Sequence, residues 1–182
     1  MYRKNKVAAA FEHIALSIGS NCGDRLWYME RMVVQLREVL EPRLDISVLM
    51  ETEPLEVAGE QSWYLNRIIG GRYRGTPEEL LSHCRSIEEA LGRTGKGLRK
   101  PRTADVDILL FGNVAVTGTG LTLPHPGILR RRFCLEGLVQ IMPDTVIATT
   151  GKTVREHHEF MEPMVRSQQI RFVVPQGDHH GD

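Results

Sequence analysis

Two amphipathic helices separated by strand-like runs constrain the fold of this chain more than any other feature. The first helix follows the N-cap candidate Asp24. The second follows Thr76-Pro77-Glu78-Glu79, which combines a Thr N-cap, a Pro at the first helical position and a Glu three residues after the cap. Strand candidates lie at 13–18, at 46–52, at 63–73 and around Asp105. This β-α-β-β-α-β order predicts a ferredoxin-like α+β fold, an antiparallel sheet with both helices on one face.

The spacing of apolar residues predicts which helix faces are buried. The first stripe contains Leu26, Met29, Val33, Leu36 and Leu40, and Glu41-Pro42 ends that helix. The second stripe contains Leu80, Cys84, Ile87 and Leu91, and Gly92 stops it. After Gly112 we expect a loop and then C-terminal additions: a helix over 131–141, a short helix near 154–161 and a strand near 170–174.

Length and composition suit one soluble domain. The chain has 182 residues, of which 41% are hydrophobic and 25% charged. We expect a single domain over 1–182, with a core at 12–150 and a C-terminal extension at 151–182 whose last residues, from 177, are frayed. Lys+Arg and Asp+Glu both number 23, so no overall field draws the chain to nucleic acid or to a membrane.

The N-terminus and the cysteines indicate the compartment. The apolar stretch Val7 to Phe11 that follows the basic N-terminus is too short for a signal sequence. Cys22, Cys84 and Cys134 are odd in number and far apart, which argues against a disulfide framework or a zinc site. We therefore expect reduced thiols and a cytoplasmic protein.

Asp105 and Asp107 lie two residues apart in a run typical of a buried strand. Because side chains alternate along a strand, both carboxylates share one face, with Cα atoms roughly 6.6 Å apart. Two carboxylates roughly 5 Å apart repel by about 3 kcal/mol at an effective dielectric near 20, so positive charge must lie beside them. The spacing favours a two-cation phosphate site and, equally, a salt bridge to Arg102.

A basic segment leads into the Asp-containing strand. It includes Arg93, Lys96, Arg99, Lys100 and Arg102. Such a segment is typical of a solvated loop, but beside a carboxylate pair it also suits a polyphosphate. A phosphate-binding P-loop is excluded, because Gly97 stands where that motif needs Ser or Thr and a helix precedes the segment.

Four further residues carry polar or aromatic chemistry. Tyr64 and Asn66 point to the same side of a strand and suit a flat heterocycle, although a core Tyr and a turn-facing Asn fit equally well. His125 lies between Pro124 and Pro126, so it is either a rigidly held donor near phosphates or an ordinary turn residue. Glu88 lies beside the apolar stripe of its helix, where it contributes to the site or pairs with Arg85.

Taken together, these segments resemble the 6-hydroxymethyl-7,8-dihydropterin pyrophosphokinase family, from about Ile14 to Asp144. Five blocks in the family's order and spacing carry the resemblance: Ile18-Gly19-Ser20-Asn21; Glu51-Thr52-Glu53-Pro54-Leu55 with Gln61 and Tyr64-Leu65-Asn66; Ile87-Glu88 with Leu91-Gly92-Arg93; Pro101 to Leu109; and Leu123-Pro124-His125-Pro126 with Arg131-Arg132-Phe133. The resemblance implies transfer of diphosphate from ATP to a pterin alcohol in folate biosynthesis.

The resemblance also implies a role for individual residues. Asp105 and Asp107 bind two Mg²⁺ ions and act in catalysis with Arg93 and Arg102. The implied pterin pocket contains Thr52, Leu55, Tyr64, Asn66 and Phe133. The implied ATP contacts are Glu88, Arg102, Ile108, His125 and Arg131. The implied partners are these small molecules alone, without nucleic acid or membrane, and the protein is expected to be a monomer.

Departures from the family pattern cluster in the basic loop. Gly95 stands where a second Arg is common, and Arg99 replaces an aromatic or amide residue. Lys96 and Lys100 are the nearest substitutes, but Lys does not make the bidentate contact that Arg makes. Two other classes of function stay open on the residues alone: a non-catalytic pterin or nucleotide binder, and a ferredoxin-like RNA binder. Against the RNA-binding function, this sequence lacks the exposed aromatic residues that such modules place on their strands.

Overall fold

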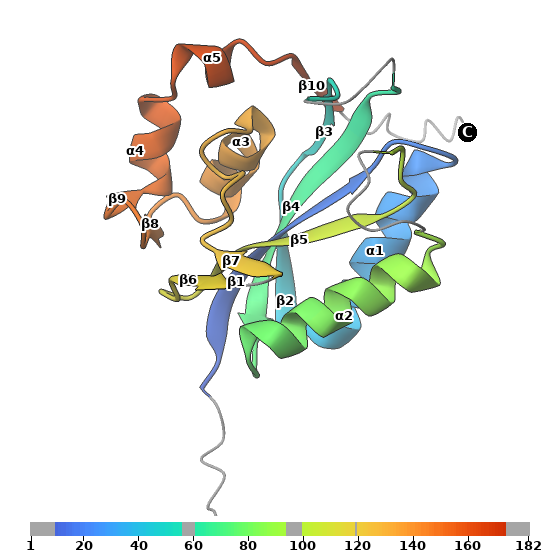
Figure 1. Cartoon of the computed structure of the whole chain (residues 1–182), viewed down its shortest axis with the longest axis horizontal. Helices are drawn as coiled ribbons and strands as arrows, with labels where there is room; N and C mark the ends of the chain where they lie inside the picture. Colours follow the sequence, from blue (N-terminus) through green and yellow to red (C-terminus); the bar gives the residue numbers. More distant parts are fainter. Residues whose placement is uncertain (1–9, 56–60, 94–99, 119, 174–182) are drawn as a thin grey trace, which may run out of the picture.

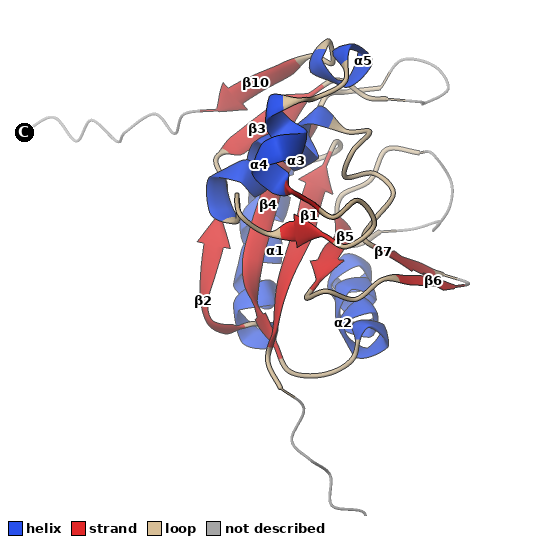
Figure 2. Ribbon diagram, turned by 90° about the vertical axis from the view of Figure 1, so that its left-hand side faces the viewer, coloured by secondary structure: helices blue, strands red, loops and turns tan. Residues whose placement is uncertain are grey.

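A six-stranded antiparallel sheet forms the centre of the structure (Figures 1 and 2). The structure is a computed structural model that describes residues 10–55, 61–93, 100–118 and 120–173. The strands of this sheet are β1 (Glu12–Ser20), β2 (Glu41–Ile46), β3 (Leu49–Thr52), β4 (Tyr64–Tyr73), β5 (Asp105–Phe111) and β10 (Ile170–Val173). Their order is β10-β3-β4-β1-β5, and β2 also pairs with β4. The first and last segments of the described chain are therefore joined in one sheet.

The first two helices cover one face of the sheet (Figure 1). They are α1 (Arg25–Val39) and α2 (Pro77–Ala90). Asp24 caps α1 by accepting a hydrogen bond from the Trp27 N–H at 3.0 Å, and Thr76 and Glu79 form a reciprocal capping box at α2. The core beneath these helices contains the strand residues Ile14, Leu16, Ile18, Leu65, Ile69, Val106 and Ile108. Strand alternation leaves the intervening residues for the opposite face.

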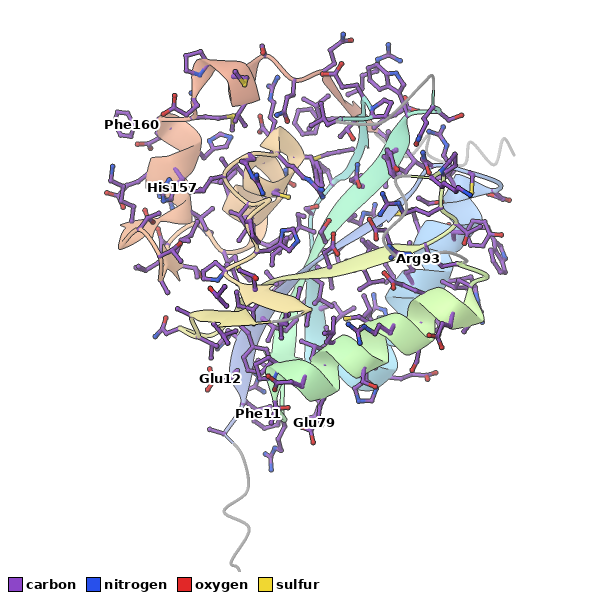
Figure 3. All side chains as sticks on the ribbon, viewed as in Figure 1. Phe11, Glu12, Glu79, Arg93, His157 and Phe160 are labelled. Carbon is purple, nitrogen blue, oxygen red and sulfur yellow. The ribbon has the colours of Figure 1, made fainter. Side chains whose placement is uncertain are left out.

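The opposite face carries the helices of the C-terminal part of the chain (Figures 1 and 2). They are α3 (Arg132–Ile141), α4 (Val154–Glu159) and α5 (Pro163–Arg166). A second core forms there from residues of the strands and helices, including Ala15, Met50, Ile68, Leu109, Leu110, Cys134 and Leu138. Phe160, at the end of α4, is 78% exposed and points away from the sheet (Figure 3). In the described ranges, no helix combines the length and apolarity that a membrane crossing requires.

A β-bulge in β5 fixes which side chains face this second core. The pairing register shifts between Ala15, opposite Leu110, and Leu16, opposite Ile108. Leu109 is the extra residue, and both Leu109 and Leu110 are buried in the second core. Before the bulge, Asp105 and Asp107 lie on this same face, as the spacing predicts.

Most predicted elements are confirmed, but two segments differ. The expected strand 46–52 is shortened to β3, and β2, which ends at Ile46, occupies residues where no strand was expected. The chain leaves the ladder between them, at Ser47 and Val48. The Ser47 hydroxyl accepts the Ile68 N–H at 2.9 Å, so the break leaves that donor paired. The expected loop after Gly112 contains a hairpin of β6 (Val116–Gly118) and β7 (Leu121–Leu123). Two short strands, β8 (Val146–Ile147) and β9 (Lys152–Thr153), form a further hairpin.

The buried face of α1 also differs from the predicted stripe. Leu26 is 55% exposed, whereas Met32 is fully buried. Tyr28, one turn before Met32, packs against the core instead of Leu26. The apolar face is therefore rotated toward Met32, and Leu26 lies at its edge. The other members of both predicted stripes pack into the core or against it.

We predict that Gly137→Ala destabilises the protein. A Cβ at position 137 would lie 2.9 Å from the Cβ of Ile68, because α3 packs closely on β4 there. Ala favours a helix over Gly by up to about 1 kcal/mol, and overpacking costs about 1–3 kcal/mol. We expect a lower urea midpoint with an unchanged slope. An equal or higher midpoint would show that Ile68 moves aside without cost.

Candidate functional site

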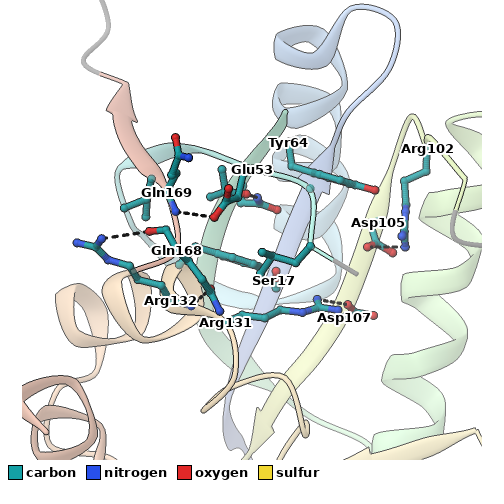
Figure 4. A pocket seen from close by; sticks show the side chains of 16 residues that line it. Ser17, Glu53, Tyr64, Arg102, Asp105, Asp107, Arg131, Arg132, Gln168 and Gln169 are labelled. Atoms are coloured by element: carbon teal, nitrogen blue, oxygen red, sulfur yellow. Dashed lines mark hydrogen bonds and ion pairs between the residues drawn. The ribbon is translucent and has the colours of Figure 1, made fainter. Parts of the chain in front are cut away.

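The main cavity opens on the face of the sheet that carries α3 (Figure 4). Strand alternation brings polar side chains of three neighbouring strands to this face: Ser17 from β1, Asn66 from β4, and Asp105 and Asp107 from β5. The remaining walls come from the end of β3 and the residues after it, from the start of β4, from the segment before β5, from the segment that begins α3 and from the residues before β10. They include Thr52, Leu55, Tyr64, Arg102, Arg131 and Phe133. All five residues expected to hold the pterin therefore line one cavity.

Asp105 is held by two arginines from different elements. Arg93, just after α2, places Nη1 2.6 Å from Oδ1. Arg102 places Nη1 2.9 Å from Oδ2 (Figure 4). Arg93 also forms a short ion pair with the buried Glu88, whose carboxylate accepts the Val106 N–H at 2.8 Å. The salt bridge from Arg102 to Asp105 is thus present, and Glu88 pairs with Arg93.

Arg102 is fixed through its backbone as well as its side chain. Its N–H donates to Asn21 Oδ1 at 2.7 Å, and its carbonyl accepts the Asn21 N–H at 3.1 Å. Its guanidinium lies 5.8 Å from the centre of the Tyr64 ring. Burial alone would lower the pKa of Arg102, but the charge of Asp105 and the contact with Tyr64 outweigh it and raise that pKa. Arg102 is therefore a permanently charged wall of the cavity.

Asp107 is less well compensated than Asp105. Arg131 Nη1 lies 3.9 Å from Oδ2, and 35% of the Asp107 side chain is exposed (Figure 4). Burial and the neighbouring Asp105 raise the pKa of Asp107 to about 7, against the lowering effect of Arg131. A cation that enters the cavity would therefore stabilise the ionised form of Asp107.

The carboxylate pair fits a magnesium ion that shares its coordination with a ligand. Among the described residues, no group of three or more His, Cys, Asp and Glu side chains is placed to hold a metal ion. Mg²⁺ is commonly bound by only one or two carboxylates together with substrate phosphates and water. Asp105 and Asp107 meet that requirement, and burial together with the charge of Asp105 raises the pKa of Asp107, which a bound cation would counteract.

A second cavity lies between α2, β5 and the β6–β7 hairpin. Asp107 lines both cavities, so the two meet at this carboxylate. Four residues expected at the ATP or catalytic site also line the second cavity: Glu88, Arg93, Ile108 and His125. Arg102 and Arg131, expected to contact ATP, line the first cavity at its border with Asp107. The predicted residues thus form two neighbouring groups.

His125 is held in one tautomer. Its backbone N–H donates to the Leu109 carbonyl at 2.9 Å, beside the β5 bulge, and its ring Nδ1 accepts the Gly127 N–H at 2.9 Å. Burial, together with Arg131, lowers the pKa of His125 to about 4, so the ring is neutral at pH 7. With Nδ1 accepting, the proton of the neutral ring resides on Nε2. His125 is therefore a hydrogen-bond donor and not a proton donor at this pH.

Asn66 is fixed in the floor of the main cavity. Its Nδ2 donates to the Thr52 hydroxyl at 2.8 Å, and both residues are buried. Gly19 pairs with Asn66 across β1 and β4, and a Cβ at Gly19 would lie 2.6 Å from Asn66 Oδ1. Glycine at position 19 therefore leaves the space that the Asn66 amide occupies.

Sequence reasoning missed several residues of the main cavity. Ser17 shares the face of Gly19 on β1, and alternation along that strand would have identified it. No local pattern indicates the others, which are Glu53, Arg132, Gln168, Gln169 and Ile170. Of the basic segment, Lys96 and Arg99 lie outside the described residues, as does the departure at Gly95.

Relatives of this chain occur as separate proteins and as parts of longer ones. The 2-amino-4-hydroxy-6-hydroxymethyldihydropteridine pyrophosphokinase of Methylorubrum extorquens is 34% identical over 148 residues, covering 81% of this chain and 92% of that protein. The Bacillus subtilis protein of the same name is 35% identical, covering 78% and 85%. The folic acid synthesis protein fol1 of Schizosaccharomyces pombe is 36% identical over 84% of this chain, which spans only 20% of that relative.

Solved structures agree with the fold. Plasmodium falciparum HPPK-DHPS, crystallised in wild-type form with pteroate, has a TM-score of 0.65 at 13% sequence identity, over 83% of this chain and 42% of that one. A triple mutant of that protein with SDX-DHP gives 0.67 at 14% identity, over 86% and 45%. At this level of identity the likeness concerns the fold alone.

A family model described as 7,8-dihydro-6-hydroxymethylpterin-pyrophosphokinase (HPPK) matches residues 15–143, between β1 and the end of α3. The matched range contains the carboxylate pair, the arginines that surround it and the five residues expected to hold the pterin. Because this range is more than half of the chain, the protein belongs to the 7,8-dihydro-6-hydroxymethylpterin-pyrophosphokinase family.

Proposed function

We propose that this protein transfers diphosphate from ATP to 6-hydroxymethyl-7,8-dihydropterin in folate biosynthesis, giving AMP and the pterin diphosphate. The observation that carries the proposal is the meeting of two cavities at Asp107. The main cavity has aromatic and amide walls with arginines at its border, and the second cavity is lined by Ile108, His125 and Arg93 among others. A reaction between two bound substrates needs such adjacent sites, because binding then replaces the entropy cost of their encounter.

The main cavity is the proposed pterin site. Asn66 and Thr52 present polar groups from the floor, and Tyr64, Phe133 and Leu55 supply the flat apolar surfaces that a heterocycle requires. The remaining capacity of the Asn66 amide, one donor and the carbonyl oxygen, is suited to the edge of a pterin ring.

The second cavity is the proposed nucleotide site. Ile108 offers apolar contact, and neutral His125 offers the Nε2 proton as a hydrogen-bond donor to phosphate oxygen. Arg102 and Arg131, at the border of the main cavity, supply positive charge to the phosphates. Glu88 fixes Arg93 and the start of β5 and is a proposed nucleotide contact.

The proposed metal ligands are Asp105 and Asp107, for two Mg²⁺ ions. When bound, Mg²⁺ neutralises phosphate charge and lowers the pKa of the attacking hydroxyl. Arg93 and Arg102 now balance the charge of Asp105, so ligation by Asp105 requires these arginines to turn toward the phosphates. In this exchange the same two arginines would pass from stabilising Asp105 to stabilising the reacting group.

The proposed transfer is a single displacement. The hydroxymethyl oxygen attacks the β-phosphorus of ATP, and an O–P bond forms while the bond from that phosphorus to the α–β bridging oxygen breaks. AMP leaves with the bridging oxygen, and the hydroxyl proton is released to solvent. The chain contributes by holding the two substrates in line and by placing Arg102 and Arg93 beside the phosphates.

We also propose the finer points of fold and setting that go with this function. The order of β3, β4, β1 and β5, with α1 and α2 on one face, supports a ferredoxin-like core at 12–150 within a single domain over 1–182. Both proposed substrate sites are formed by residues of this chain, and we propose that the enzyme is a monomer. The three cysteines are free thiols, in keeping with a cytoplasmic protein.

We expect the purified protein to form AMP from ATP only when both Mg²⁺ and 6-hydroxymethyl-7,8-dihydropterin are present, as measured by chromatography. Asp107→Asn removes the less compensated carboxylate and lowers the rate by about a hundredfold or more. The control is Asp144→Asn. The Asp144 side chain is 82% exposed and lies far from Asp107 in the sequence, so this variant keeps the parent rate. Pterin binding without AMP formation would instead support a non-catalytic binding protein.

We expect the affinity for Mg²⁺ to rise with pH. Because the folded-state pKa of Asp107 is raised to about 7, the carboxyl is mostly protonated at pH 6 and mostly ionised at pH 8. Protons then compete with the cation at the lower pH, and the affinity increases about tenfold between these values. Calorimetric titration with a non-hydrolysable ATP analogue measures it. The same titration of Asp107→Asn measures the part of the pH dependence that comes from the nucleotide. An equal pH dependence in that variant would contradict the assignment of the effect to Asp107.

We expect Gly19→Ala to weaken pterin binding selectively. The added methyl group displaces the Asn66 amide, so the dissociation constant for the pterin, measured by fluorescence titration, rises about tenfold as hydrogen bonds are lost. The KM for ATP is the internal control and stays at the parent value. Equal losses for both substrates would indicate a general distortion of β1.

A further inference from the structure

A short segment of the C-terminal extension forms one wall of the main cavity. Gln168 and Gln169 lie directly before β10, and they line the cavity together with Ile170 (Figure 4). Strand β10 pairs with β3 from Ile170, opposite Thr52, to Val173, opposite Leu49. This wall lies beyond residues 15–143, the range that the family model matches.

Gln168 fills the place of a missing helix cap. Helix α3 begins at Arg132, and its N-cap residue Arg131 makes no capping hydrogen bond with its own side chain to any described residue. The first N–H groups of a helix have no partner inside the helix. Here Gln168 Oε1 accepts the Arg132 N–H at 2.8 Å, and Gln168 Nε2 donates to the Arg130 carbonyl at 2.8 Å. Both ends of one amide thus hold residues 130–132.

The same segment is also attached from the other side. Arg132 Nη1 donates to the carbonyls of Arg166 at 3.0 Å and of Gln168 at 3.2 Å. The Arg132 side chain is itself held by Glu136, with Nε 3.0 Å from Oε1. The contact between Gln168 and residues 130–132 is therefore reciprocal, because each segment both donates to and accepts from the other.

Gln169 connects the segment that holds residues 130–132 to the opposite wall of the main cavity. Its N–H donates to Glu53 Oε1 at 2.8 Å, and its carbonyl accepts the Glu53 N–H at 3.4 Å. Glu53 follows Thr52 and precedes Leu55, two of the residues proposed to hold the pterin. Residues 168–169 therefore bridge the two sides of the cavity.

We propose that Gln168 is a positioning residue for the pterin site: its amide fixes residues 130–132 so that Arg131 and Phe133, on either side of Arg132, face the cavity. This role rests on the proposed function, because it assigns the wall to the pterin substrate. Gln168 acts through the backbone of other residues, and the groups that meet the substrate are those of Phe133 and Arg131.

Another glutamine of the chain provides a matched control. Gln140, near the end of α3, accepts the Val48 N–H at 2.9 Å and donates to the Glu136 carbonyl at 2.8 Å. It joins two segments with the same pair of hydrogen bonds as Gln168, but it does not line either of the two cavities proposed to bind substrates. Gln140→Leu removes the same number of hydrogen bonds from the same helix and leaves the proposed site intact.

The test compares Gln168→Leu with Gln140→Leu in the full chain. Fluorescence titration with 6-hydroxymethyl-7,8-dihydropterin, without ATP, measures binding, and amide hydrogen exchange measures protection at Arg132 and Cys134. We expect Gln168→Leu to raise the pterin dissociation constant about tenfold and to speed exchange at Arg132 by a similar factor. Gln140→Leu keeps the parent values in both experiments. Gln168→Glu keeps the acceptor for the Arg132 N–H, recovers part of the affinity and provides a second variant if the first does not fold.

Other outcomes separate the two proposals. If AMP forms in the parent but Gln168→Leu binds pterin as the parent does, or Gln140→Leu weakens binding equally, the positioning role is wrong and the transferase stands. If the parent binds pterin without forming AMP and the two leucine variants still differ, the transfer reaction is wrong and the positioning role stands. A parent that neither binds pterin nor forms AMP overturns both.

Discussion

Repulsion between Asp105 and Asp107 is the interaction on which the rest of the site depends. Both carboxylates lie on one face of β5, and close like charges in a protein are stable only beside positive charge. The fold supplies that charge unequally. Asp105 has Arg93 at 2.6 Å and Arg102 at 2.9 Å, whereas Asp107 has Arg131 at 3.9 Å and its pKa is raised to about 7. The charge of Asp105 is therefore balanced by the arginines of the fold, whereas that of Asp107 is left to be balanced by a bound cation.

The unequal balance follows from the position of β5 in the sheet. Arg93 follows α2, on one face, and Arg131 precedes α3, on the other. Strand β5 lies at the sheet edge beside β1, so cations from both layers reach its first residues. The bulge at Leu109 then turns the strand so that Leu109 and Leu110 both enter the core under α3, while the Leu109 carbonyl holds His125. The bulge at Leu109 thus contributes both to the packing of β5 and, through His125, to the wall of the second cavity.

Local signals in the sequence predicted the parts of this architecture that local physics determines. The caps at Asp24 and Thr76, the alternation that pairs Asp105 with Asp107, and the central strands needed no information from distant residues. The division of β2 from β3 depends on Ser47 meeting the Ile68 N–H, and the exposure of Leu26 depends on Tyr28 covering the core. These are tertiary contacts, and a periodicity argument does not contain them.

The same distinction explains why the chemistry of the site was more predictable than its walls. Carboxylates and arginines act through charge, and their identity and spacing are visible in the chain. The wall at residues 130–133 takes its position from Gln168, 36 residues after Arg132, through hydrogen bonds to backbone groups that any residue provides. Such a contact leaves no motif at residues 130–132, because an N–H and a carbonyl are present at almost every position. A family resemblance that ends before Gln168 therefore predicts which groups react, while the extension that follows it determines how firmly one side of the pocket is held.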